Sequence, residues 1–113
     1  MGRPIASVVV STYAGEALIG DCIRMLLGQT IADELEIIVV DSGSPQEERV
    51  VVEALQRDHP NVRYVRTERE TLYRAWNRAL ELATGTYFVN VNIDDWLRDD
   101  GLELMASALD LHP

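Results

Sequence analysis

Four short apolar runs, separated by stretches of helical periodicity, constrain the fold of this chain more than any other feature. The runs are rich in β-branched residues and cover Ile5–Val10, Glu36–Val40, Val62–Arg66 and Tyr87–Val91. Such runs are typical of strands buried on both faces, although the third run alternates as a strand at a sheet edge does. We therefore expect an α/β fold of about four strands and four helices, in which helices cover both faces of a mainly parallel sheet.

Capping signals predict where several helices begin or end. Gly28 is expected to end the first helix, and Thr71 or a neighbour is expected to begin the third. Ser44 is expected to cap the second helix, with Pro45 at the first helical position and Glu47 completing a capping box. Each helix would then follow its strand after a short loop.

The length and composition are those of an ordinary globular protein. The 113 residues suit one compact domain over positions 1–113, with 47% apolar and 26% charged residues. No apolar run approaches the roughly 20 residues that cross a bilayer, and the start of the chain lacks a signal-peptide pattern. The single cysteine, Cys22, cannot form an internal disulfide. We expect a cytoplasmic protein, and a longer parent enzyme could act at the cytoplasmic face of the membrane.

The charge pattern excludes several classes of function. A formal net charge of −9 argues against a nucleic-acid binder, which needs a basic surface. All ten basic residues are arginine, so a P-loop lysine is absent, and no GxGxxG follows the first predicted strand. A phosphate-bearing ligand would therefore need another neutralising group.

Polar residues follow three of the predicted strands at the point where each strand ends. They are Ser11-Thr12-Tyr13, Asp41-Ser42-Gly43-Ser44 and Asn92-Ile93-Asp94-Asp95. In sheets of this kind, ligands gather beyond the carboxyl ends of the strands, where the strand order reverses. Because Mg²⁺ and Mn²⁺ prefer oxygen ligands, Asp94 and Asp95 are candidate ligands of a cation that bridges to a diphosphate.

Four segments stand in order along the chain: SVVVSTY, EIIVVDSGS, LYRAWNRALELATGTY and NVNIDD. Their order, spacing and strand context resemble the amino-terminal half of a family 2 glycosyltransferase of the GT-A fold, over about residues 5–105. The resemblance implies a Rossmann-like half that binds a nucleoside-diphosphate sugar through Mg²⁺ or Mn²⁺ in an inverting transfer. It identifies neither the sugar nor the acceptor, which could be a saccharide, a lipid or a protein.

The resemblance assigns the nucleoside to the first two loops. Ser11, Thr12 and Tyr13 match the segment that lies against the base. Asp41 matches the first acid of a D-D-G-S turn that contacts the base or ribose. Ser42 stands where many members have a second aspartate that hydrogen-bonds the base, so the preference among nucleotides stays open.

The resemblance assigns the metal and the diphosphate to the last loop. Asn92, Asp94 and Asp95 fall in a segment that matches the family's D-A-D-D, with Asp94 as the final acid of the DxD element. Asn92 replaces the first acid and brings no charge, although its carbonyl oxygen can still ligate a metal or hold a water. No catalytic residue is identified, because the family's general base belongs to a second half that has no counterpart here. The isolated chain is expected to be incomplete and inactive.

Structural interpretations stand beside these functional ones. Asp94 and Asp95 could begin a helix, with Asp99 and Asp100 as its first turn. Asp41 could simply shape a tight turn with its neighbours.

Three further types of side chain have similar alternatives. Trp76 is expected in the core rather than as a sugar platform, and Cys22 is expected to be a small core residue. An arginine from the pair Arg66 and Arg69, or from the third helix, could reach a diphosphate.

The rival function is a non-catalytic α/β module or degenerate fragment that packs against a partner, including a second copy through the unfinished sheet.

Overall fold

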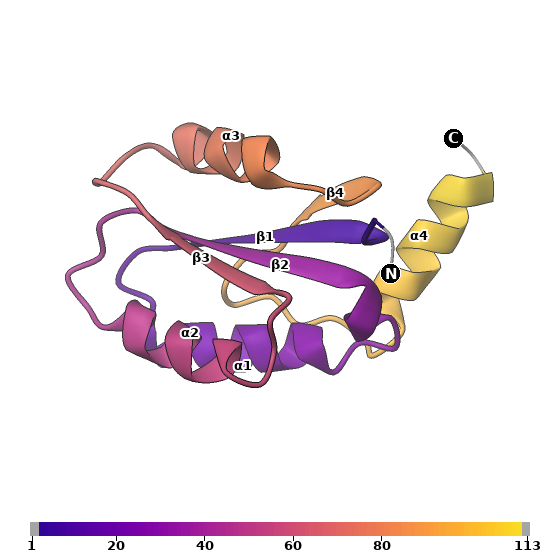
Figure 1. Ribbon diagram of the computed structural model, residues 1–113, viewed down its shortest axis with the longest axis horizontal. Helices are drawn as coiled ribbons and strands as arrows, with labels where there is room; N and C mark the ends of the chain where they lie inside the picture. The colour runs from indigo at the N-terminus through magenta and orange to yellow at the C-terminus, as the bar shows by residue number, and fades with distance from the viewer. Residues whose placement is uncertain (1–2, 112–113) are drawn as a thin grey trace.

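Four parallel strands form the centre of the structure, a computed structural model that describes residues 3–111 (Figure 1). The strands are β1 (Ala6–Thr12), β2 (Leu35–Asp41), β3 (Val62–Arg66) and β4 (Tyr87–Asn90). They lie in the order β3-β2-β1-β4, and each neighbouring pair is parallel. The expected parallel α/β sheet is confirmed, with β3 at an edge as its alternating sequence predicts.

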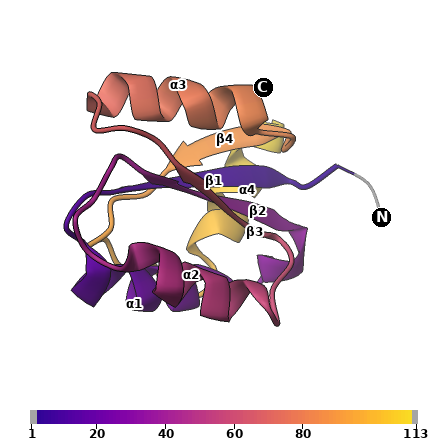
Figure 2. The same ribbon diagram turned by 60° about the vertical axis from the view of Figure 1, so that its left-hand side comes forward.

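Helices cover both faces of this sheet. They are α1 (Glu16–Leu27), α2 (Glu48–Gln56), α3 (Leu72–Leu82) and α4 (Gly101–Leu111), and a short 3-10 helix, η1 (Ala32–Glu34), precedes β2. Helices α1 and α2 pack on one face and α3 on the other, whereas α4 lies beside the end of the sheet where the strands begin (Figures 1 and 2). The hydroxyl of Tyr87 donates a hydrogen bond to Asp110, which ties α4 to the start of β4.

The alternation of side chains along β1 and β2 divides the core into two layers. Val8, Val10, Ile37 and Val39 are buried on the α1 and α2 face. The residues between them face α3, where the second cluster contains Val9, Ile38, Val40, Ala75 and Ala79. Burial on both faces explains why these strands are continuous apolar runs instead of alternating ones.

The predicted limits of the helices are correct at two places and wrong at a third. Gly28 follows α1, and the hydroxyl of Thr71 caps α3 by accepting from the N–H of Arg74. Ser44, however, does not cap α2, which begins at Glu48. The Ser44 hydroxyl instead donates to the Glu48 carboxylate at 2.7 Å and accepts from the N–H of Ala14 at 2.9 Å. The Ser44 hydroxyl, which the local sequence assigns to the helix cap, is therefore bonded to the loop after β1 and to Glu48 instead.

Candidate functional site

The strand order reverses at β1, since the chain adds β2 and β3 on one side of β1 and β4 on the other. A pocket of about 270 Å³ lies at this point, beyond the carboxyl ends of β1 and β4. It is lined by Ser11, Leu18, Leu72, Trp76, Asn90, Val91, Asn92, Ile93 and Asp94. Ligands of parallel α/β sheets bind at such reversals, so this pocket is the candidate site.

The pocket brings together three of the predicted site residues, Ser11, Asn92 and Asp94. The hydroxyl of Ser11 is buried and has no hydrogen-bond partner among residues 3–111. Buried polar groups are nearly always bonded, so this hydroxyl is available to a ligand or a water. Trp76 is half-buried and packs against the core on the α3 side, as predicted, yet its side chain also lines the pocket.

The segment from Asn92 to Asp95 is a turn that closes on itself. The N–H of Asp95 donates to the carbonyl of Asn92 at 2.9 Å, and the carboxylate of Asp95 accepts from the N–H of Asn92 at 2.9 Å. Helix α4 begins only at Gly101, so the interpretation of Asp94 and Asp95 as helix-start acids is wrong. Asp94 is exposed, and its carboxylate makes no hydrogen bond or ion pair within the described part of the chain.

Asp41 is completely buried at the carboxyl end of β2. One carboxylate oxygen accepts from the N–H of Ser44 at 2.8 Å, and the other accepts from the Arg66 guanidinium at 2.9 Å and from the Tyr64 hydroxyl. Burial, followed by the bond to Asp41, raises the pKa of Tyr64 to about 12. Asp41 thus holds the turn in which Gly43 has a φ of +72°, as the structural interpretation predicts.

The other predicted nucleoside residues have different surroundings. Thr12 is buried, and its hydroxyl donates to the Glu48 carboxylate at 2.9 Å. Ser42 is also buried, and its N–H donates to the carbonyl of Thr12 at 3.1 Å. Tyr13 is 44% exposed, and the Arg69 guanidinium lies 4.2 Å from its ring centre and bonds its hydroxyl at 2.8 Å. Tyr13 is therefore the exposed aromatic side chain of this set, although Arg69 lies over its ring.

Glu48 is a central residue of this region that the sequence did not reveal. Its buried carboxylate accepts from the hydroxyls of Thr12 and Ser44 and from the N–H of Gly15 at 3.3 Å. These bonds join the loop after β1 to the loop after β2. In the sequence, Glu48 is one of two adjacent acids near a helix start, and nothing there distinguishes it from its exposed neighbour Glu47.

Cys22 lies beneath the last loop, with its thiol 3.9 Å from the carbonyl oxygen of Asn92. Burial raises the pKa of Cys22 to about 11, and the negative charges of Asp95 and Asp94 act in the same direction. The thiol therefore stays protonated at neutral pH and is unsuited to nucleophilic chemistry. The expectation that Cys22 is a small core residue is confirmed.

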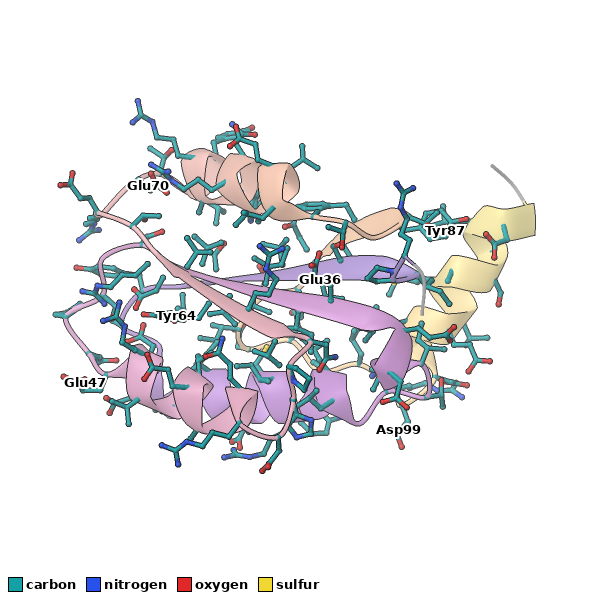
Figure 3. The ribbon with its side chains drawn as sticks, in the orientation of Figure 1. Glu36, Glu47, Tyr64, Glu70, Tyr87 and Asp99 are labelled. Atoms are coloured by element: carbon teal, nitrogen blue, oxygen red, sulfur yellow. The ribbon has the colours of Figure 1, made fainter. Side chains whose placement is uncertain are left out.

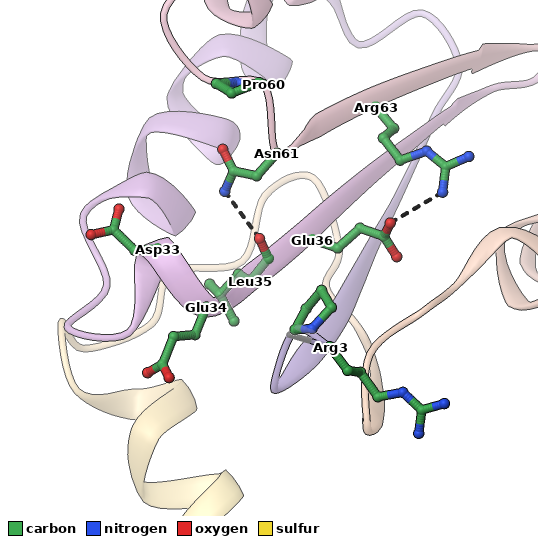
Figure 4. Close-up of a pocket in the computed structure, with 9 residues that line it drawn as sticks. Arg3, Asp33, Glu34, Leu35, Glu36, Pro60, Asn61 and Arg63 are labelled. Atoms are coloured by element: carbon green, nitrogen blue, oxygen red, sulfur yellow. Dashed lines mark hydrogen bonds and ion pairs between the residues drawn. The ribbon is translucent and has the colours of Figure 1, made fainter. Parts of the chain in front are cut away.

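A larger cavity, of about 510 Å³, lies at the opposite end of the sheet (Figure 4). Two hydrogen bonds join residues of its lining: the Arg63 guanidinium donates to Glu36 at 3.1 Å, and the Asn61 amide donates to the carbonyl of Leu35 at 3.0 Å. We assign this cavity a structural role, because its bonds join the amino ends of β2 and β3.

The described residues limit the metal and membrane interpretations. Within residues 3–111, no group of three or more His, Cys, Asp or Glu side chains is placed to hold a metal ion. A cation at the candidate site would therefore take its charged ligands from Asp94 and Asp95 and the rest from neutral oxygens or a ligand. Among the helices of the described chain, none is both long and apolar enough to span a membrane.

Comparisons with known proteins agree with this arrangement. The family model described as glycosyl transferase family 2 matches residues 7–113. Chondroitin synthase of Escherichia coli is 31% identical over 101 residues, which make up 89% of this chain and 15% of that protein.

Two solved structures share the fold. A mannosyltransferase from Pyrobaculum calidifontis, in complex with GDP-Man and Mn²⁺, aligns with a TM-score of 0.81 and 30% identity over 96% of this chain and 32% of its own. S. aureus TarS in complex with UDP-GlcNAc aligns with a TM-score of 0.85 and 29% identity over 95% of this chain and 31% of its own. The chain thus spans about a third or less of the length of these relatives.

Proposed function

The chain belongs to glycosyltransferase family 2, and from this premise we propose that it forms the nucleotide-sugar-binding portion of a metal-dependent, inverting glycosyltransferase. The observation that carries the proposal is the pocket at the strand-order reversal, where Ser11, Asn92 and Asp94 meet. Relatives with the same fold were solved with GDP-Man and with UDP-GlcNAc, which supports a nucleoside-diphosphate sugar as the ligand.

The loops after β1 and β2 are proposed to hold the nucleoside. Tyr13 offers to the base the part of its ring that Arg69 leaves exposed, and Ser11 offers a hydroxyl that has no partner within residues 3–111. Thr12, Asp41 and Ser42 are buried, so we assign them to shaping these loops around the nucleoside, with their backbone groups nearest the ligand. In the free chain, the side chains of Thr12 and Asp41 are bonded to other residues.

The loop after β4 is proposed to hold Mg²⁺ or Mn²⁺ together with the diphosphate. The donor set fits such an ion, because within residues 3–111 Asp94 is unpaired and one oxygen of Asp95 accepts no hydrogen bond, and Asn92 adds a neutral oxygen. When bound there, the ion would offset the negative charge of the leaving diphosphate. The Mn²⁺ in the mannosyltransferase complex supports this choice of cation.

The acceptor and the general base are proposed to lie outside the described residues. Within residues 3–111, Asp94 is the one carboxylate that lines the pocket, and we assign it to the metal. The isolated chain should therefore bind the donor without transferring the sugar.

Calorimetric titration with UDP, GDP, dTDP and CDP tests this function, each with Mn²⁺ and again with a chelator. We expect one or two of the nucleotides to bind with Mn²⁺ and to lose most of their affinity when the chelator is present. A Kd of about 1 mM corresponds to only about 4 kcal/mol of binding free energy, so titration to millimolar nucleotide detects even weak binding. If no nucleotide shows metal-dependent binding at that level, the donor-binding function is wrong for this chain.

A further inference from the structure

A second concave surface, of about 300 Å³, lies between the end of β3 and the start of α3. Four arginines line it, Arg66, Arg69, Arg74 and Arg78, together with two acids, Glu68 and Glu70. Figure 3 shows Glu70 in the loop that leads into α3. Four of the ten arginines of a chain with a net charge of −9 therefore gather on one surface, and none of them lines the candidate donor pocket.

The positive charge of this surface is only partly compensated. Arg66 forms an ion pair with Asp41 at 2.9 Å, and Arg78 forms one with Glu70 at 2.7 Å. Arg69 bonds a neutral group, the Tyr13 hydroxyl, and Arg74 forms no ion pair with any described residue. Two guanidinium groups thus carry unpaired positive charge on the same concave surface, against one acid, Glu68, that forms no ion pair with a described residue.

Guanidinium groups arranged in this way suit a phosphoryl oxyanion. Like charges held close together repel, and an anion placed between them removes that cost. The planar fork of an arginine matches the oxygens of a phosphate and can donate two parallel hydrogen bonds. We propose that this surface, the β3–α3 anion site, binds a phosphate group.

The β3–α3 anion site is separate from the proposed diphosphate site. β3 and β4 are at opposite edges of the sheet, three strand spacings apart, which corresponds to roughly 14 Å. The surface borders the proposed nucleoside site through the bond from Arg69 to Tyr13, but its arginines do not line the pocket of Asn92 and Asp94. We therefore assign the bound phosphate to another molecule or to another part of the substrate. The source is either free inorganic phosphate or a phosphate ester on an organic group.

The test is a titration of the whole chain with three probes in the presence of a chelator and without nucleotide. The probes are inorganic phosphate, inorganic pyrophosphate and glycerol 3-phosphate, followed by NMR shifts of the arginine Nε–H groups and by calorimetry. We expect binding of at least one probe, with shifts at Arg69 and Arg74 and an affinity that falls as salt rises. Tighter binding of glycerol 3-phosphate than of inorganic phosphate would identify an ester as the ligand, and the reverse order would identify the free ion.

Matched variants make the test specific. Arg74→Gln should weaken binding at least five-fold, whereas Arg57→Gln should leave it unchanged, because Arg57 is exposed and does not line this surface. Arg74→Lys keeps the charge and should retain part of the affinity, which separates loss of the ligand contact from loss of fold. Equal weakening by Arg57→Gln, or no binding of any probe, would overturn the proposal. Binding that requires Mn²⁺ and disappears in Asp94→Ala would also overturn it, because the probe would then occupy the donor site.

Discussion

Asp94 and Asp95 are neighbours in the sequence, but the structure gives them different surroundings. The carboxylate of Asp95 closes the turn by accepting from the N–H of Asn92, whereas Asp94 is exposed and unbonded within residues 3–111. The two acids are therefore expected to respond differently to mutation, although both are proposed metal ligands.

Replacing each acid by alanine tests this difference. Asp94→Ala should weaken metal-dependent nucleotide binding and leave the free energy of unfolding nearly unchanged. Asp95→Ala should also weaken binding, and it should lower the free energy of unfolding by about 0.5–1.5 kcal/mol because the turn loses a hydrogen bond. Calorimetry and urea denaturation measure the two effects. Equal stability losses for both variants would contradict the assignment of the turn to Asp95.

Glu48 is expected to contribute more to stability than any exposed acid on α2. Glu48→Gln places an amide donor opposite another donor, because the two carboxylate oxygens together accept three hydrogen bonds. The free energy of unfolding should fall by about 1–3 kcal/mol in urea denaturation. Glu47→Gln is the matched control and should have almost no effect, since Glu47 is exposed. If Glu48→Gln is as stable as the wild type, these hydrogen bonds add little net stability.

At the residue scale, the sequence predicts which polar side chains follow the strands but not which partners they have. Ser11, Asn92 and Asp94 meet in one pocket because parallel strands end at one edge, and that follows from the order of elements. The partners of Thr12 and Asp41 come from α2 and β3, and no local pattern in the sequence identifies them. The roles of these residues in ligand binding stay predictions.

Among the elements, the loop after β2 depends on a backbone conformation that favours glycine. Gly43 has a φ of +72°, and a Cβ there would lie 2.7 Å from the backbone nitrogen of Arg69. Gly43→Ala should therefore lower the free energy of unfolding by at least about 1–2 kcal/mol, measured by thermal and urea denaturation. Gly28→Ala is the control, since its Cβ would meet nothing closer than 3.5 Å and its φ is −88°. Similar losses of unfolding free energy in Gly43→Ala and Gly28→Ala would show that the backbone conformation of Gly43 is not the cause.

Strand positions are predicted within one or two residues because β1 and β2 are buried on both faces and end in polar loops. Helix limits are less reliable where tertiary contacts compete with local signals. Thr71 caps α3 as predicted, but the hydroxyl of Ser44 bonds Glu48 and the loop after β1 instead of starting α2. A sequence pattern therefore predicts a helix cap correctly only when the capping side chain does not hydrogen-bond a distant part of the chain.

For the whole molecule, Glu36 is a buried acid that joins distant parts of the chain. Its carboxylate accepts from the hydroxyl of Ser7, the guanidinium of Arg63 and the N–H of Thr84. Burial alone would raise the pKa of Glu36, but the hydrogen bonds from Thr84, Ser7 and Arg63 outweigh it and lower the pKa below its usual value. The carboxylate form is therefore favoured in the folded state.

This lowered pKa predicts a loss of stability in acid. The contribution of Glu36 is complete above the unfolded-state pKa, near 4.3, and it disappears as the pH falls through the lower pKa of the folded state. Glu36→Gln should therefore be less stable than the wild type at pH 7, with a difference that shrinks below about pH 4. Urea denaturation between pH 3 and 7 measures it, with the exposed Glu81→Gln as the control. A difference that stays constant with pH would contradict the role of the carboxylate.

The outer edge of β4 is a candidate surface for association between copies of the chain. The N–H groups of Tyr87 and Val91 bond the carbonyls of Ile5 and Val9, on the β1 side. The alternating residues Phe88 and Asn90 therefore direct their N–H groups to the outer edge, which pairs with no described strand. Unpaired strand edges favour association. We expect concentration-dependent self-association in sedimentation experiments, which Asn90→Pro should reduce and Asn90→Ala should not. A monomer at all concentrations would rule out this surface and weaken the rival function of an interaction module.

The strand order also determines when the donor pocket can form during synthesis. β1 pairs on one edge with β2, the next strand in the sequence, but on its other edge with β4, which follows β2 and β3 in the sequence. The pocket has walls from both β1 and the loop after β4. In a nascent chain the proposed donor pocket should therefore form only after β4 and the loop that follows it have emerged.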